Sequence, residues 1–329
     1  MTSLNAIYSR PSMRRRYEAW FLRFGLTDGS GAWWFRYLLT NLGLTNLGLT
    51  NLGLTSMGRG GCPGVAGAAP AQIWATWFPR DGHPKSFIQE FSLDTLKLGP
   101  RSGPFSLDIG TNHIEENACR GAIEPHGQRI SWDLNYHSHF RATLSNKGWI
   151  GFSRTPHSDA VFSGEVRFGD RVFRGDPLGI GVQGHNCGFR HRNFWTWTHA
   201  CFPQADGSIT TFEALVYEMP LGLVFRKAIL WHKGEAHVFR KVRESCRDRG
   251  LLRWTLEATS SAGTVEVDAD GGGASLHRLP YAKTDCSGSF DVSNNSRARV
   301  RLRLDLRNLA GASELATEDG AVLEMTGDY

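Results

Sequence analysis

The sequence predicts an all-β protein with few helices, made of barrels or sandwiches. Many short apolar segments recur at even spacing, and the 38 glycines imply many turns between them. No amphipathic pattern of normal helix length interrupts this series. The length of 329 residues and a fresh start of the pattern near Asp176 favour two consecutive β domains, 1–176 and 177–329.

The N-terminal half opens with a predicted hairpin. Residues 17–24 and 32–39 read as strands on either side of a turn rich in Gly and Asp. They carry Glu18 and Arg36 among aromatic residues, a pattern that allows either a buried ion pair or two solvated charges. Further strands are predicted at residues 72–78, 85–91, 105–109, 113–119, 129–136, 160–168 and 171–174.

A five-residue repeat separates the second predicted strand from the third. Leu-Thr-Asn-Leu-Gly occupies residues 39–43 and recurs to residue 53, with an imperfect fourth copy at 54–58. Four copies are too few for a stacked solenoid. Because the entropy of loop closure grows slowly with length, we expect a duplicated insertion that lengthens a loop over residues 39–71.

The C-terminal half continues the same rhythm. Strands are predicted at residues 194–202, 208–217, 222–232, 235–244, 251–260, 263–268, 289–292, 298–307 and 321–325. Residues 298–307 alternate most cleanly, with aliphatic side chains on one face and arginines on the other. An arginine row of this kind could meet an anion, but a solvated outer face that discourages edge pairing is the favoured interpretation.

Charge, cysteines and apolar runs exclude several classes of protein. The net charge of +5 is mostly scattered and no nucleic-acid motif accompanies it, so no nucleic-acid partner is expected. Six widely spaced cysteines without a Cys-x-x-Cys pair argue against a zinc ribbon or a thioredoxin site. No signal peptide and no run long enough to span a bilayer is visible. A reducing cytoplasm with free thiols fits this pattern best.

The candidate site lies in residues 184–202. Gly184 to Gly188 reads as a polar turn holding His185 and Asn186, and residues 194–202 read as a strand. Alternation places four side chains on one face of that strand: Trp195, Trp197, His199 and Cys201. A ladder of indoles and an imidazole suits an apolar pocket with few polar groups, although a packed core with hydrogen-bonded histidines fits the same pattern.

Three segments here carry a family likeness: Phe162-Ser-Gly-Glu-Val166, Gly184-His-Asn-Cys-Gly188 and Phe194-Trp-Thr-Trp197. The chain resembles the double-lipocalin superfamily of hydroxyneurosporene synthase (carotenoid 1,2-hydratase) and the AttH-like proteins. Tocopherol cyclases and the lipocalin-like fungal Diels–Alderases are relatives. The shared mark is an Asn-Trp-Gly turn followed by a Trp-rich strand. Asn186, Gly188, Trp195 and Trp197 match it, whereas Cys187 stands in place of the Trp.

The resemblance implies two lipocalin-like antiparallel β-barrels packed together, with an elongated apolar ligand bound in or between them. It also implies chemistry on isoprenoid double bonds, in which an acid protonates an alkene and aromatic faces stabilise the cation. The candidate proton donors are His185, His199, Asp133, Glu18 and Glu213. The candidate ligand-binding residues are Asn186, Trp195, Trp197, Trp20, Trp34 and Trp132.

Three other functions compete with this cofactor-independent hydratase or cyclase. A non-catalytic carrier of a hydrophobic ligand needs the apolar cavity but no proton donor. A metal site would draw on His185, His191 and His199 with Cys187 and Cys201, but no standard metal motif is present, so neither a metal nor another cofactor is expected. Nucleophilic catalysis by Cys187 with a histidine base lacks a hydrolase signature.

Overall fold

A computed structural model describes residues 3–10, 16–42, 69–100, 103–148, 150–307 and 311–327. This part of the chain is almost entirely β-strand, which confirms the predicted fold class. Short 3-10 turns lie at η2 (Leu93–Thr95), η3 (Pro125–Gly127) and η4 (Pro220–Gly222). Within the described ranges no helix is long and apolar enough to cross a membrane. The five-residue repeat lies outside the described residues from residue 43 onward.

Within the described residues the N-terminal sheet has 12 strands, and all its neighbouring pairs are antiparallel. Its strands are β1 (Tyr17–Leu26), β2 (Gly31–Thr40), β3 (Ala71–Pro79), β4 (Lys85–Phe91), β5 (Leu96–Leu98), β6 (Ser106–Ile109), β7 (Asn112–Glu115), β8 (Ala118–Ile123), β9 (Ile130–His137), β10 (Ala142–Asn146), β11 (Gly151–Phe168) and β12 (Arg171–Gly188). They run in the spatial order β4-β3-β2-β1-β12-β11-β9-β8-β7-β6-β5, with β10 paired to β11. The first strand therefore lies beside the last one at the middle of the sheet.

The C-terminal sheet has 10 strands in the part of the chain that the structure describes, and its neighbouring pairs are antiparallel too. Its strands are β13 (Trp195–Pro203), β14 (Ile209–Glu218), β15 (Val224–His232), β16 (Glu235–Phe239), β17 (Lys241–Asp248), β18 (Arg253–Ser260), β19 (Gly263–Asp270), β20 (His277–Ala282), β21 (Ser289–Leu306) and β22 (Ser313–Thr326). The order is β16-β15-β14-β13-β22-β21-β19-β18-β17, with β20 paired to β21. Here too the first strand, β13, lies beside the last, β22.

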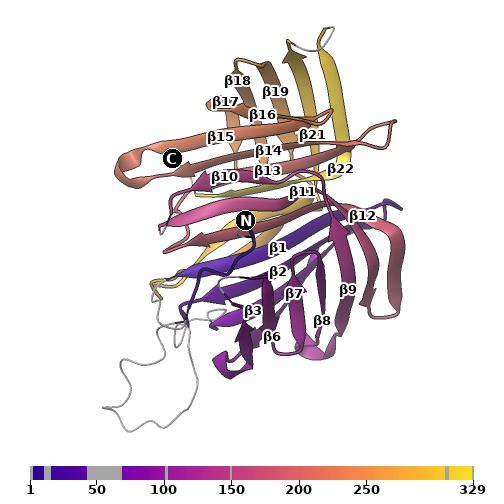
Figure 1. Cartoon of the computed structure of the whole chain (residues 1–329), viewed down its shortest axis with the longest axis vertical. Helices are drawn as coiled ribbons and strands as arrows, with labels where there is room; N and C mark the ends of the chain where they lie inside the picture. The colour runs from indigo at the N-terminus through magenta and orange to yellow at the C-terminus, as the bar shows by residue number, and fades with distance from the viewer. Residues whose placement is uncertain are drawn as a thin grey trace.

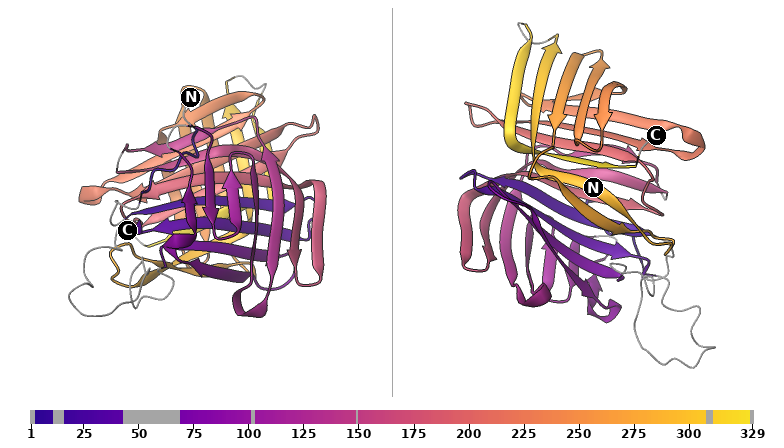
Figure 2. Two further views of the ribbon diagram at one scale, coloured as in Figure 1. Left: turned by 60° about the horizontal axis from the view of Figure 1, so that its bottom comes forward. Right: turned by 180° about the vertical axis from the view of Figure 1, so that it is seen from behind.

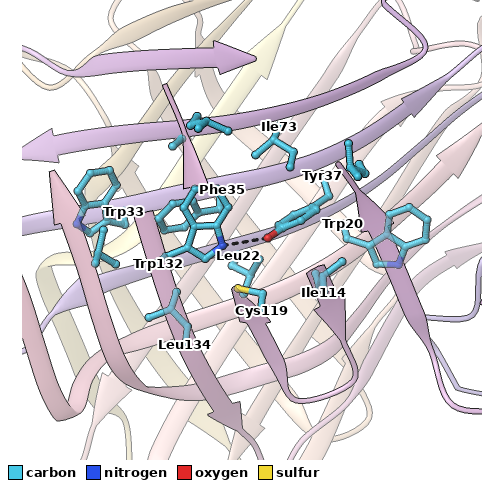
Figure 3. Close-up of a cluster of buried hydrophobic side chains, with 14 of the residues drawn as sticks. Trp20, Leu22, Trp33, Phe35, Tyr37, Ile73, Ile114, Cys119, Trp132 and Leu134 are labelled. Atoms are coloured by element: carbon cyan, nitrogen blue, oxygen red, sulfur yellow. Dashed lines mark hydrogen bonds between the residues drawn. The ribbon is translucent and has the colours of Figure 1, made fainter. Parts of the chain in front are cut away.

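Each sheet curls around a core of its own. In the N-terminal sheet this core is aromatic, with the fully buried rings of Trp20, Trp33 and Phe35 among aliphatic side chains from the facing strands (Figure 3). The indole N–H of Trp132 donates to the hydroxyl of Tyr37 at 2.9 Å, which satisfies the polar atoms of both rings. The core of the C-terminal sheet is mostly aliphatic. Both interiors are therefore packed by their own side chains.

The two curled sheets lie one against the other (Figures 1 and 2). A third apolar cluster joins them, with Phe21 and Trp34 from the N-terminal sheet and Trp197 and Leu215 from the C-terminal sheet. The fully buried guanidinium of Arg23 on β1 also crosses this interface and donates to backbone carbonyls of β21 and β22. Two half-barrels packed together confirm the expected lipocalin-like architecture.

The chain passes from one sheet to the other between Gly188 and Trp195. The strand β12 runs through residues 176 and 177, where the sequence pattern starts afresh. The division of the chain into two domains, 1–176 and 177–329, stays a prediction.

The polar turn predicted at Gly184 to Gly188 is wrong, because these residues form the last part of β12. Their glycines are explained by close packing against β1. A Cβ atom on Gly184 would lie 2.1 Å from Cζ of Phe21, and one on Gly188 would lie 3.1 Å from Cε1 of Tyr17. Glycine here makes room for aromatic rings of the neighbouring strand, a use that looks like a turn signal in sequence.

We expect Gly184→Ala to destabilise the protein by about 1–3 kcal/mol, because overpacking forces the Phe21 ring out of position. Urea unfolding followed by circular dichroism measures this change. The matched control is Gly250→Ala, whose new Cβ would meet only the flexible end of Asp248, at 3.3 Å. Equal unfolding midpoints for the two variants would contradict the packing argument.

Glu18 and Arg36 are neither paired with each other nor solvated. Both are buried, and the β1–β2 register sets Arg36 opposite Phe21, so the two charges lie on opposite faces of the sheet. The arginines of β21 lie on a solvated outer face, as the favoured interpretation of the sequence predicts, since Arg299 and Arg303 are exposed there.

The cysteines follow the expectation of free thiols only in part. Four described cysteines are free thiols: Cys119, Cys187, Cys201 and Cys246. Cys286 is disulfide-bonded, a pairing that sequence spacing did not indicate.

Candidate functional site

A cavity of about 340 Å³ lies between the two sheets, within the size range of small-molecule sites. The N-terminal sheet contributes Tyr17, Phe21, Trp34, Arg36 and Asn186 to its lining. The C-terminal sheet contributes Trp195, Trp197, Glu213, Tyr217, Tyr281 and Glu324. Aromatic rings thus dominate the walls, and a few polar groups converge among them. This composition suits an apolar small molecule held in a defined orientation.

The predicted faces of the Trp-rich strand are confirmed. Trp195 and Trp197 on β13 face the N-terminal sheet and line the cavity, while Phe194 and Ala200 pack into the core of the C-terminal sheet. The ring of Trp197 meets Phe21 edge to face, with the ring centres 5.3 Å apart. Because β13 lies between β14 and β22, its indoles reach side chains on both neighbouring strands.

Glu213 on β14 is a buried acid in the wall of the cavity. Its carboxylate accepts hydrogen bonds from the indole N–H of Trp197 at 2.9 Å and from the hydroxyl of Thr155 at 2.8 Å. Burial outweighs these hydrogen bonds and raises the pKa of Glu213 to about 7. At neutral pH this residue therefore exists in both protonation states, which suits general acid–base chemistry.

Glu324 on β22 is a second acid in the same cavity, and its side chain is half-buried. The indole N–H of Trp195 donates to its Oε1 at 2.8 Å, and the amide of Asn294 donates to its Oε2 at 3.1 Å. Burial raises the pKa of Glu324, although these hydrogen bonds oppose the shift. The Trp-Thr-Trp segment thus holds two carboxyl groups, one with each indole.

Several polar atoms in the cavity wall have no partner within the described part of the chain. They are Nη1 of Arg36, Oδ1 of Asn186 and both ring nitrogens of His191. The His191 ring stacks on Tyr17 at 4.0 Å, and its burial holds the His191 pKa well below the usual value. Other buried polar atoms without a partner in the described ranges lie outside the cavity, among them Nη1 of Arg23 and Nε1 of Trp33, but these four share one cavity wall and are available to hydrogen-bond a ligand there.

His185 and Glu18 form a buried pair away from the cavity lining. Nε2 of His185 lies 2.8 Å from Oε1 of Glu18, its Nδ1 lies 2.7 Å from the carbonyl oxygen of Leu4, and the ring stacks on Trp20. Glu18 also accepts hydrogen bonds from the backbone N–H groups of Tyr8 and Ser9. These contacts fasten the N-terminal segment to the sheet.

His199 is fully buried at the interface but is not part of the cavity lining. Its Nε2 donates to the carbonyl oxygen of Ser158 at 2.8 Å. Burial and the nearby Arg23 guanidinium lower the pKa of His199 to about 3, so the imidazole is neutral and has no acidic proton to give at neutral pH.

The remaining candidates from the sequence lie elsewhere. Trp20 and Trp132 pack inside the N-terminal sheet, and Asp133 is exposed on the opposite face of β9 from Trp132. Trp34 and Asn186 do line the cavity, with Trp195, Trp197 and Glu213. The structure therefore brings together one of the candidate acids and four of the candidate ligand-binding residues.

The thiol of Cys187 does not have the properties of a catalytic nucleophile. Burial, together with the charge of Glu18, raises the pKa of Cys187 to about 12, and Nη1 of Arg16 donates to its sulfur at 3.2 Å. The thiol of Cys187 is therefore protonated at neutral pH. No three His, Cys, Asp or Glu side chains are grouped to hold a metal ion in the ranges that the structure describes.

Arg36 and Glu324 are cavity residues that the sequence reasoning did not select as site residues. Each is a single charge within an otherwise apolar strand: Trp33-Trp34-Phe35-Arg36-Tyr37 and Ala321-Val322-Leu323-Glu324-Met325. A lone charge in such a run is the signal that could have found them, since charged residues are rarely buried without a reason.

Solved structures share this arrangement of two packed sheets. Kievitone hydratase from Nectria haematococca superposes with a TM-score of 0.53 at 11% identity, over 100% of this chain and 96% of that protein. A protein described as AttH from Nitrosomonas europaea gives 0.51 at 12% identity, over 95% and 93%. CghA gives 0.57 at 13% identity, over 97% and 89%. This chain has their fold.

At such identities the likeness shows the fold alone. At the level of the fold, the likeness confirms the double-lipocalin resemblance seen in the sequence, because an AttH protein is among the structures that superpose. No protein family and no curated protein sequence matches the chain. Its function is therefore argued from the cavity.

Proposed function

We propose that this protein converts an elongated, unsaturated hydrophobic molecule by acid-catalysed hydration or cyclisation in the cavity between the sheets. The observation that carries the proposal is Glu213, a buried carboxyl in an aromatic cavity whose pKa is raised to about 7. An isoprenoid- or polyene-like ligand fits the apolar lining. One neighbour in fold is named a hydratase, which agrees with this reaction class.

Glu213 acts first as an acid in this scheme. Its carboxyl gives a proton to one carbon of a double bond, and the other carbon becomes a cation. The ring of Trp197 stabilises that cation, because aromatic rings attract positive charge. In hydration, water then adds to the cation and returns a proton to the Glu213 carboxylate; in cyclisation, a nucleophile within the ligand forms the bond instead. The carboxyl is regenerated in either case.

Trp197 and Thr155 are positioning residues. Their hydrogen bonds fix the direction of the Glu213 carboxyl within the wall. Because these bonds favour the carboxylate, they also keep the pKa from rising further and so ease the return of the proton. The apolar walls shield the cation from bulk water until the intended nucleophile captures it.

The first experiment identifies the ligand and then follows a proton. Native mass spectrometry with lipid extraction, on protein purified from its own host, names a co-purifying compound. Incubation of that compound with the protein in D2O is expected to give a product with one deuterium bound to carbon, because the donated proton exchanges with solvent. Heat-denatured protein in D2O is the control.

Two results would contradict the proposed acid-catalysed conversion of the ligand. A product formed without carbon-bound deuterium would contradict protonation by an acid. A co-purified ligand that returns unchanged after incubation would instead support the alternative function, a non-catalytic carrier of a hydrophobic ligand.

A further inference from the structure

The cavity is lined by an excess of positive charge. Five cationic side chains belong to its wall: Arg36, Lys147, Arg154, Arg190 and Arg192. None of the five forms an ion pair with an acidic side chain in the part of the chain that the structure describes. Glu213 and Glu324, the acids of the same cavity, are held by indole N–H groups instead.

Arg36 is the buried member of this set, with 5% of its surface exposed. Its guanidinium lies over the ring of Tyr281 at 4.2 Å and over that of Trp74 at 5.3 Å, so both rings fix its position. No hydrogen bond is formed by its Nη1 within the described residues. The buried Arg23 also leaves its Nη1 without a partner within the described residues, but its Nε and Nη2 donate to three backbone carbonyls.

The Arg36 charge acts on the Glu324 carboxyl, but no ion pair joins the two side chains and burial favours the neutral form of Glu324. A buried guanidinium is costly, and a bound anion would remove part of that cost. His191 adds two unpartnered ring nitrogens at the same end of the cavity, since its ring lies 5.5 Å from Tyr281. Of the other cations, Lys147 and Arg190 are exposed and Arg154 and Arg192 are half-buried, and all four would attract an anion towards the opening.

We infer that the ligand is a carboxylic acid, whose carboxylate binds Arg36 while its apolar body extends along the aromatic wall towards Glu213. One buried guanidinium balances the single negative charge of a carboxylate. A guanidinium is planar and suits the geometry of a carboxylate, and Nη1 of Arg36 has no partner among the described residues. The inference rests on the proposed function, because it assigns the ligand class of that same site.

Arg36 and Glu213 lie at different ends of the cavity, so the group that binds the ligand carboxylate is separate from the group that donates the proton. Arg36 contacts Tyr281, Tyr281 lies near Trp195, and Trp195 binds Glu324 on β22. Glu213 is on β14, at the other side of β13, so about two strand spacings, or roughly 10 Å, separate the two acids. A carboxylate anchored at Arg36 thus leaves a double bond several carbons away beside Glu213.

A pair of matched fluorescent probes tests this inference at pH 8: cis-parinaric acid, a polyene carboxylate, and its methyl ester, which has the same body without the charge. We expect the wild-type protein to bind the acid at least about tenfold more tightly than the ester. Arg36→Met should bring the affinity for the acid down to that for the ester, and Arg36→Lys should restore part of it. Arg301→Met, which removes an exposed arginine of the outer face of β21, is the control and should change neither affinity.

The outcomes separate the inference from the proposed function. Equal binding of acid and ester by the wild-type protein would overturn the acidic ligand and leave the apolar cavity standing. Absence of binding for both probes would overturn both ideas. The comparison in the wild-type protein needs no variant, so it decides the matter even where Arg36→Met fails to fold.

Discussion

Glutamine in place of Glu213 is expected to stop conversion of the ligand while stabilising the folded protein above pH 7. The amide has no acidic proton, so the rate should fall by about 100-fold or more, the usual contribution of a positioned general acid. Ligand binding should persist, because the side chain keeps its shape. The Thr155 hydroxyl can rotate and accept a hydrogen bond from the new amide N–H group. The amide N–H therefore does not face the hydroxyl hydrogen of Thr155.

The gain in stability follows from the sign of the pKa shift. The pKa of Glu213 is higher in the folded protein, about 7, than its ordinary value of 4.5. Its contribution to stability is therefore complete below pH 4.5 and is lost as the pH rises through about 7, where a buried carboxylate forms. Glutamine does not titrate. Relative to the wild type, the variant should gain about 2–3 kcal/mol between pH 5 and pH 8.

Urea unfolding at pH 5 and pH 8 measures the stability difference, and turnover of the identified ligand measures the rate. Asp133→Asn is the matched control, an acid-to-amide change on the exposed face of β9, and should alter neither quantity. A Glu213→Gln variant with full turnover would remove Glu213 from the chemistry. A stability difference that is the same at both pH values would show that Glu213 does not titrate near neutrality.

Local alternation was the strongest guide to this fold, because the period of two is a property of each strand alone. It gave the correct faces for β13, with Trp195 and Trp197 turned together, and for the arginine side of β21. The interpretation of glycines as turn residues failed in β12, where Gly184 and Gly188 make room for rings of β1. A glycine-rich segment of this kind looks like a turn in the sequence but forms a strand in the structure. Only the side chains of the neighbouring strand show why the glycines are there.

The site was harder to predict because the central strands are buried on both faces. In β1, Trp20 faces the core and Phe21 faces the cavity, yet both are aromatic residues in one apolar run. Sequence cannot say which face of such a strand meets a ligand. The better signal was a lone charge in an apolar strand, which would have selected Arg36 and Glu324 and also included Glu213.

Glu18 obeys the same signal, but its surroundings indicate a structural role. All three of its partners are positioned as donors: the backbone N–H of Tyr8 at 2.8 Å, that of Ser9 at 2.5 Å and Nε2 of His185 at 2.8 Å. Glu18→Ala leaves these buried groups unpaired, so we expect it to destabilise the protein by about 3–5 kcal/mol. The N-terminal segment would also lose two of its hydrogen bonds to the sheet, and would keep those of Asn5 to Gln183 and Trp20.

Glu18→Gln should be destabilising too, by about 1–3 kcal/mol, because its amide group must face at least one of those donors. Glutamine is thus expected to act with opposite sign at the two buried glutamates: it destabilises at Glu18 and stabilises at Glu213 above pH 7. Urea unfolding at pH 8, with limited proteolysis of the N-terminal segment, measures both effects. A Glu18→Gln protein as stable as the wild type, with its N-terminus still protected, would show that Glu18 does not fasten that segment, and its pairing with His185 would need another explanation.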